Sequence, residues 1–168
     1  STYAQLVADG EIELGDKINI VVPTGNFGNI LAGYYAKHMG VPVNKLICAS
    51  NANNVLTDFI KTGIYDRNRP FHTTISPSMD ILISSNLERL LYHLSGSDDA
   101  QIREWFGSLS KTGRYEVTDE VKKAIADEFY AGCCDDEQTK ACIKEIYDEY
   151  SYTSDTHTAV AVKVYKDY

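Results

Sequence analysis

The sequence lacks any long apolar run and is poor in positive charge. No stretch approaches the ~20 apolar residues that a membrane-spanning helix needs, and the first residues lack the basic-then-apolar order of a secretory signal. Acidic residues outnumber basic ones by 24 to 16, which gives a formal net charge of -8 at pH 7. A chain this acidic is not expected to hold nucleic acid or an anionic membrane by charge. We therefore expect a cytoplasmic protein.

Cysteine is scarce too, and its spacing indicates no metal site. The four cysteines are Cys48, Cys133, Cys134 and Cys142. They form no C-x-x-C pair and have no histidine at a zinc-ligand spacing, so we expect no bound metal. Buried free thiols are the ordinary expectation for such residues. The adjacent Cys133 and Cys134 could be redox-active, but their neighbours Phe129 and Tyr130 are more typical of core.

Short apolar strands alternate with helical patterns in the first part of the chain. The segments 17–22 (KINIVV) and 46–49 (LICA) are compact apolar runs, which are typical of buried strands. Between them, apolar residues recur at helical spacing over 30–39, and Gly40 then supplies a stop signal. Parallel strands need a covering helix between them, so this order predicts right-handed crossover units on a mostly parallel sheet.

Capping residues and weaker patterns indicate further elements. The N-caps expected for three helices are Asn54, Thr118 and either Asp135 or Asp136. The remaining expected elements are helices over 85–94, 98–109 and 157–165, a third strand over 129–134 and an extended piece over 115–117. Together these elements predict a three-layer α/β fold, in which a mostly parallel open sheet carries helices on both faces.

The predicted organisation is a single α/β domain over residues 1–168. Residues 1–15 indicate the remnant of a preceding helix. Because helical pattern runs up to both ends of the chain, we expect a piece of a longer protein, and the remainder of that parent chain is then its natural partner.

The motif that indicates chemistry is PTGNFGN, Pro23 to Asn29, where a strand ends and a helix begins. At this position a helix presents free N–H groups and about half a positive charge, which suits a phosphate group. Gly25 and Gly28 are expected to allow close approach of the backbone and to take dihedrals that other residues resist. Asn26 and Asn29 add side-chain donors without adding charge.

Other interpretations of this loop stay open on the motif alone. The spacing is not G-x-G-x-x-G, and no Lys-Ser/Thr pair follows as in a nucleoside-triphosphate loop, so a nucleotide is disfavoured. An isolated G-x-x-G more often forms an ordinary strand-to-helix turn.

Longer segments resemble the threonine synthases, which are pyridoxal-phosphate (PLP) enzymes with a tryptophan synthase β-like, type II fold. Three segments carry the resemblance in order and at comparable spacing, namely 23–51, 54–69 and 76–96, and it returns over 155–165. They cover roughly half of the chain and are far more specific than a short motif.

The resemblance implies roles for particular residues. The residues whose main-chain N–H groups would bind the PLP phosphate are Gly25, Asn26, Phe27, Gly28 and Asn29. The hydroxyl of Thr158 would face the pyridine nitrogen of the cofactor and, being neutral, leave it less fully protonated than an aspartate would. The alternative for Thr158 is that it caps the last helix. The family usually has proline where this chain has Thr156, which puts the backbone path to Thr158 in question, and His157 receives no catalytic role.

Two further residues lie in the similar segment SSNLERL. Asn86 and Arg89 follow a predicted helix start, where an arginine could clamp a substrate phosphate or carboxylate. A solvated arginine on a helix face is the ordinary alternative.

The resemblance implies a carbon–oxygen lyase acting on phosphates. Such an enzyme converts O-phospho-L-homoserine and water into L-threonine and phosphate in threonine biosynthesis, with PLP as cofactor. In the family, the lysine that holds PLP as a Schiff base lies before the loop, in a segment absent from this chain. We therefore expect no catalytic residue here and no activity of the isolated chain. The alternatives are a non-catalytic α/β module that binds a phosphorylated ligand, and a purely structural domain.

Overall fold

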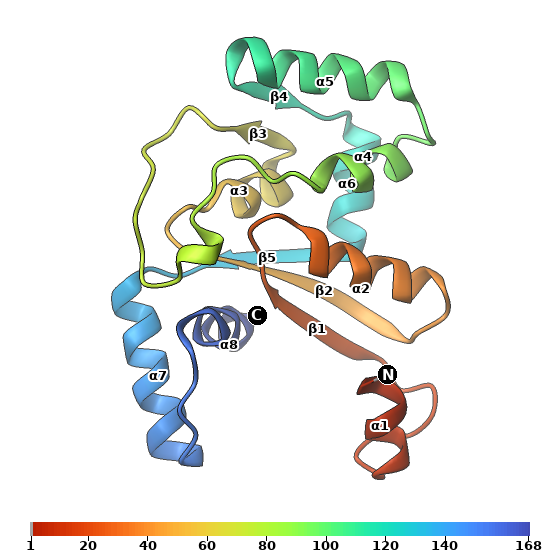
Figure 1. Ribbon diagram of the computed structural model, residues 1–168. Coiled ribbons are helices and arrows are strands. Elements are labelled where there is room, and N and C mark those ends of the chain that lie inside the picture. Colours follow the sequence, from red (N-terminus) through yellow and green to blue (C-terminus); the bar gives the residue numbers. More distant parts are fainter. Residues whose placement is uncertain (1) are drawn as a thin grey trace.

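A three-stranded parallel sheet lies at the centre of the computed structural model, which describes residues 2–168 (Figure 1). Its strands are β1 (Ile18–Pro23), β2 (Val43–Ser50) and β5 (Phe129–Cys133), in the order β1-β2-β5. Both pairings are parallel, and Cys48 of β2 lies beside Val22 of β1 and Ala131 of β5. The three predicted strands and their parallel arrangement are thus confirmed.

Helices cover both faces of this sheet (Figure 1). One face carries α2 (Gly28–His38), α3 (Val55–Thr62), α4 (Leu87–Leu94) and α6 (Asp119–Glu128). The other carries α7 (Asp136–Tyr150) and α8 (Thr156–Asp167). Along β2, Leu46 and Cys48 belong to the first hydrophobic core, whereas Ile47 and Ala49 belong to the second. This alternation buries a strand on both sides, as a three-layer fold requires, and confirms the predicted fold class.

A second, antiparallel sheet was only half predicted. It pairs β3 (Ile64–Asp66) with β4 (Arg114–Glu116) beside α5 (Asp99–Thr112). The paired Tyr65 and Tyr115 stack with ring centroids 5.3 Å apart. The sequence indicated the second strand as an extended piece but not the first, because three residues are too few to show a strand period.

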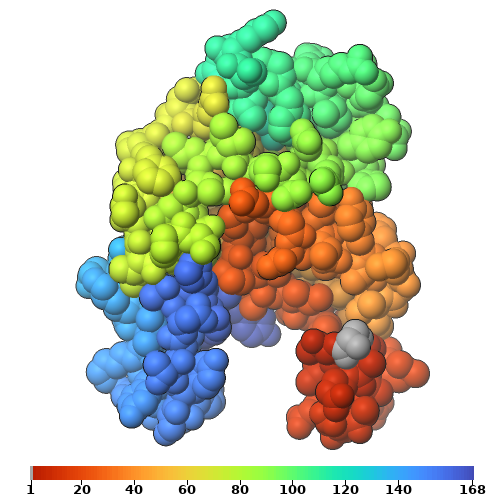
Figure 2. All heavy atoms as spheres, viewed as in Figure 1, coloured from red at the N-terminus to blue at the C-terminus, as the bar shows by residue number. Residues whose placement is uncertain are grey.

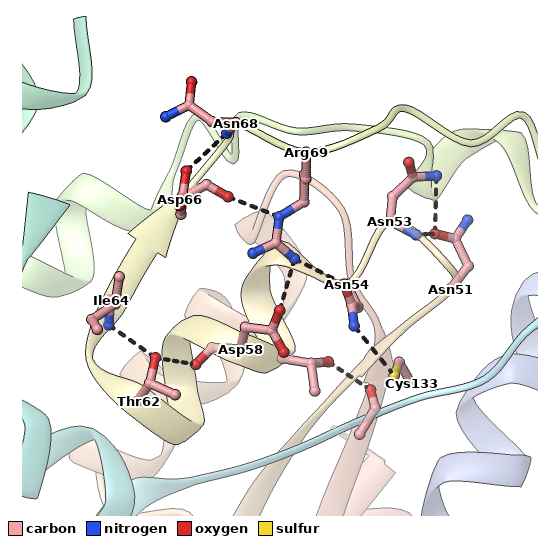
Figure 3. A network of polar contacts seen from close by, with 12 residues as sticks. Asn51, Asn53, Asn54, Asp58, Thr62, Ile64, Asp66, Asn68, Arg69 and Cys133 are labelled. Carbon is pink, nitrogen blue, oxygen red and sulfur yellow. Dashed lines mark hydrogen bonds and ion pairs between the residues drawn. The ribbon is translucent and has the colours of Figure 1, made fainter. Parts of the chain in front are cut away.

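Predicted helix caps are confirmed where the capping residue binds an N–H group three residues further along the chain. The hydroxyl of Thr118 accepts from the N–H of Val121, and Asp135 forms a capping box with Gln138. At α3 the N-cap residue is Asn54, as predicted, but its side chain makes no capping hydrogen bond. Its oxygen instead accepts from the guanidinium of Arg69 at 2.9 Å (Figure 3).

Helix α1 (Thr2–Ala8) takes up only part of the segment 1–15 that was expected to be helical. Figure 2 shows the part of the molecule formed by α1 separated by a notch from the C-terminal helices. Over residues 2–168, no helix combines the length and the apolar character that a membrane crossing would need.

Candidate functional site

A pocket of about 290 Å³ opens at the carboxyl end of β1, where α2 begins. Its lining consists of residues 22–30 from the loop, Ser78 and Met79 from the short helix η1 (Pro77–Met79), and His157 from α8. Open parallel sheets bind their ligands at this edge, because the carboxyl ends of the strands and the starts of the helices meet there. The pocket therefore lies where the sequence placed the chemistry.

Five consecutive main-chain N–H groups of this loop have no acceptor within the described part of the chain: those of Gly25, Asn26, Phe27, Gly28 and Asn29. Before this row, the N–H of Thr24 donates to the Ala49 carbonyl at 2.8 Å, and beyond Ile30 the N–H of Leu31 donates to the Phe27 carbonyl at 3.1 Å. Unpaired N–H groups at the start of a helix form an arrangement that can bind an anion.

Two carbonyl groups of the loop accept hydrogen bonds from the segment that precedes α4. The Gly25 carbonyl accepts from the Ser84 hydroxyl at 2.8 Å. The Asn26 carbonyl accepts from Asn86 twice, from its main-chain nitrogen at 3.1 Å and from its side-chain amide at 2.9 Å. In a planar trans peptide the C=O and the following N–H point in opposite directions, so these bonds turn the N–H groups of Asn26 and Phe27 away from that segment. Asn86 thus orients the loop through its two hydrogen bonds to the Asn26 carbonyl.

The unusual backbone conformation of the loop belongs to Phe27, which corrects the expectation for the glycines. Phe27 has φ 65° and ψ 2°, in the left-handed region, whereas Gly25 and Gly28 have no positive φ. Its side chain is only 1% exposed, and its ring centroid lies 5.7 Å from that of Phe129. A buried ring can hold a residue in a conformation that costs about 1–3 kcal/mol.

Gly25 is required for packing rather than for its dihedrals. A Cβ added there would lie 3.0 Å from the carbonyl oxygen of Ser78 and 3.4 Å from Cα of Met79. These are backbone atoms of η1, which forms one wall of the pocket. The missing side chain therefore lets that wall close against the loop.

Thr158 is not the cap of α8. The N-cap is Asp155, whose carboxylate accepts from the N–H groups of His157 and Thr158. The Thr158 hydroxyl donates to the other oxygen of Asp155 at 2.5 Å. This hydroxyl, followed by the N–H groups, lowers the pKa of the Asp155 carboxyl. With its hydrogen committed, the Thr158 oxygen presents only lone pairs, and Thr158 itself does not line the pocket.

The departure at Thr156 leaves the helix start intact. Thr156 is the first residue of α8, the position at which proline is best tolerated. Asp155 before it has φ -71° and ψ 162°, which also suits a residue that precedes proline. The backbone conformation observed here is therefore one that proline could also adopt.

His157 received no role from the sequence, yet it lines the pocket. Its Nε2 accepts from the main-chain N–H of Ser78 at 3.3 Å, and its Nδ1 lies 3.5 Å from a carboxylate oxygen of Asp155. The only sequence signal for this residue was its place beside Thr158, because its partner lies 79 residues away.

Arg89 lies apart from the loop. It is an exposed residue of α4 and lines a separate hollow with Tyr35, Tyr92, His93 and others. The structure therefore brings Asn86 to the loop but leaves Arg89 outside the pocket.

A polar network fixes the wall formed by η1. One carboxylate oxygen of Asp80 accepts from Asn51 at 2.7 Å, from Asn53 at 3.0 Å and from the Thr74 hydroxyl at 2.7 Å. Figure 3 shows Asn51 and Asn53 side by side just beyond β2. Burial alone raises the pKa of the Asp80 carboxyl, but the hydrogen bonds that it accepts outweigh burial and lower the pKa. The carboxylate thus ties η1 to the carboxyl end of the sheet.

Replacing Asp80 with asparagine should lower the free energy of unfolding by about 1.5–3 kcal/mol at pH 7, because buried amides lose a charged acceptor. The folded pKa lies below the ordinary value, so the stabilisation is present above about pH 4 and is lost as the pH falls. Urea unfolding should therefore show a larger difference between wild type and variant at pH 7 than at pH 3. The control is Asp99→Asn, which breaks an exposed ion pair with Arg103 and should cost less than about 1 kcal/mol. Equal losses for Asp80→Asn at both pH values would contradict the account.

The cysteines form no disulfide among the described residues. Cys48, Cys134 and Cys142 are buried as expected, and burial raises the pKa of the Cys48 thiol to about 12. The expectation was wrong for Cys133, which is exposed at the end of β5, 3.8 Å from the side-chain nitrogen of Asn54 (Figure 3). In residues 2–168, no group of three or more His, Cys, Asp or Glu side chains is placed to hold a metal ion.

Comparison with known proteins gives matches over most of the chain, although no protein-family model matches it. Threonine synthase-like 1 of Homo sapiens is 46% identical over 162 residues, covering 96% of this chain and 22% of that protein. Threonine synthase of Saccharomyces cerevisiae is 42% identical over 159 residues, covering 87% of this chain and 31% of the enzyme. A crystal structure of PLP-bound threonine synthase from Brucella melitensis has a TM-score of 0.92 at 38% identity, covering 99% of this chain and 35% of that chain.

The chain matches one segment of the threonine synthase family. The resemblance indicated by the sequence is therefore confirmed, and so is the fold that it implied. The chain spans only between 22% and 35% of the length of these threonine synthase relatives.

Proposed function

We propose that the chain supplies the phosphate-binding part of a PLP-dependent threonine synthase active site. The observation that carries the proposal is the row of five N–H groups, from Gly25 to Asn29, without a protein acceptor in the described chain. These donors suit a phosphate dianion, since backbone N–H groups and the helix dipole neutralise it without a cationic side chain. The PLP named for the Brucella melitensis neighbour fits this donor set.

Each residue then has a definite task. The five amides would hold the phosphate group, and the buried ring of Phe27 would keep them aligned. The oxygen of Thr158, whose hydrogen is donated to Asp155, would accept a hydrogen bond from the ring nitrogen and so favour its protonated form. A neutral oxygen would still leave that nitrogen less fully protonated than an aspartate would, as the resemblance implies. When bound, PLP supplies an electron sink for carbanions next to the substrate amine.

The residue that would hold PLP covalently must come from elsewhere. No lysine lines the pocket formed by the described residues. Lys37 is paired with Glu128 at 2.6 Å, and the Lys45 ammonium donates to the carbonyls at the end of α6. We therefore propose that the parent protein converts O-phospho-L-homoserine and water into L-threonine and phosphate, and that this chain alone does not.

Two ligands that differ by one phosphate group test the proposal. PLP should bind the chain saturably and be displaced by inorganic phosphate, whereas pyridoxal, which lacks the phosphate, should bind far more weakly. Equal affinity for PLP and pyridoxal would contradict phosphate recognition by the loop.

Turnover is a separate readout. With PLP and O-phospho-L-homoserine, the 168-residue chain should release no phosphate above background. Clear turnover would refute the argument from the missing lysine.

A further inference from the structure

His157 is the pocket residue that the proposed function leaves without a task. It lies in the first turn of α8 and contacts η1 directly, and both line the pocket. Its side chain is 29% exposed, so it is neither a core residue nor a freely solvated one.

The hydrogen bonds of the imidazole define its state. Ser78 donates its N–H to Nε2, so Nε2 must carry a lone pair. In a neutral imidazole the hydrogen is then on Nδ1, which faces the carboxylate of Asp155 at 3.5 Å. The ring therefore links the cap of α8 to the backbone of η1.

This link reaches the part of η1 that touches the phosphate loop. The carbonyl of Ser78 lies where a side chain on Gly25 would point. A single 3-10 turn makes few bonds of its own, so outside contacts must hold it. The network around Asp80 holds the residue that follows η1, Met79 packs into the second hydrophobic core, and the His157 ring holds the backbone of Ser78.

We propose that His157 is a positioning residue that holds η1 against the phosphate loop, so that the anion pocket is formed before a ligand arrives. The proposal rests on the proposed function of the loop. Loss of the imidazole should release the Ser78 backbone and weaken anion binding, while the cores on both faces of the sheet stay intact.

Three substitutions of His157 test whether the hydrogen bond from Ser78, rather than the bulk of the side chain, holds η1 in place. Glutamine can place its carbonyl oxygen where Nε2 lies and accept from Ser78, whereas asparagine reaches only the Nδ1 position and alanine reaches neither. Affinity for inorganic phosphate should fall about tenfold in His157→Ala and His157→Asn. In His157→Gln it should stay within about threefold of wild type. The matched control is His72→Ala, which removes an exposed imidazole outside the pocket and should change nothing.

The amide signal of Ser78 in ligand-free protein gives a readout that does not depend on phosphate. It should shift in the alanine and asparagine variants and stay near its wild-type position in the glutamine variant. Equal phosphate affinity in wild type and His157→Ala, or failure of glutamine to restore it, would overturn the positioning role. Absence of phosphate binding by the wild-type chain would instead overturn the proposed function, and with it the predicted effect on affinity.

Discussion

Replacing Phe27 with alanine is expected to lower the free energy of unfolding by about 3–5 kcal/mol. The ring is 1% exposed and packs against Phe129 at the junction of β1 and α2, so its loss opens a cavity. The left-handed backbone at this residue adds to the effect, because alanine keeps the conformational cost without the packing that offsets it.

Urea unfolding measures this change directly, and an exposed phenylalanine provides the control. Phe71 is 56% exposed, so the same substitution there should change stability by less than about 0.5 kcal/mol. A loss below about 1 kcal/mol at Phe27 would show that the ring does not anchor the loop.

Replacing Gly25 with alanine should lower the affinity for phosphate at least about tenfold. The new methyl group would meet backbone atoms of Ser78 and Met79, which cannot swing aside as a side-chain tip can. Either η1 moves away or the loop does, and both changes spoil the alignment of the five N–H groups. Overpacking of this kind also costs about 1–3 kcal/mol of stability.

Gly107→Ala is the matched control for this prediction. A Cβ at Gly107, in the interior of α5 and outside the pocket, would meet no heavy atom within 4 Å. Alanine also favours a helix interior over glycine, by about 0.5–1 kcal/mol. Isothermal titration calorimetry with phosphate should therefore show a loss of affinity in Gly25→Ala but not in the control. Equal losses of affinity in both variants would contradict the role given to Gly25.

The main elements of the fold could be predicted because their signals are local. The strands that form β1 and β2 are short apolar runs, and Thr118 and Asp135 cap helices through N–H groups three residues away. Strand β3 escaped prediction because it depends on pairing with β4, about 50 residues further along the chain. Asn54 precedes α3 as predicted, but its side chain makes no capping bond because it binds Arg69 instead, a contact that exists only in the folded chain.

The candidate site, too, was predicted only where its signals are local in the sequence. The loop itself was predictable, since a G-N-F-G-N segment between a strand and a helix is a local pattern. The contacts that shape it were not, because Ser84 and Asn86 lie about 60 residues from the carbonyls they bind. The same holds for Phe27, whose unusual dihedrals follow from tertiary packing rather than from its residue type.

The anion site is tested most directly by the ¹H–¹⁵N spectrum of the chain during titration with inorganic phosphate. We expect the amide signals of residues 25–29 to shift together and to saturate at one common midpoint. Glycines far from the pocket, such as Gly96 and Gly113, should not move. Signals of residues 25–29 that stay in place while phosphate is added would contradict the claim that these N–H groups form an anion site.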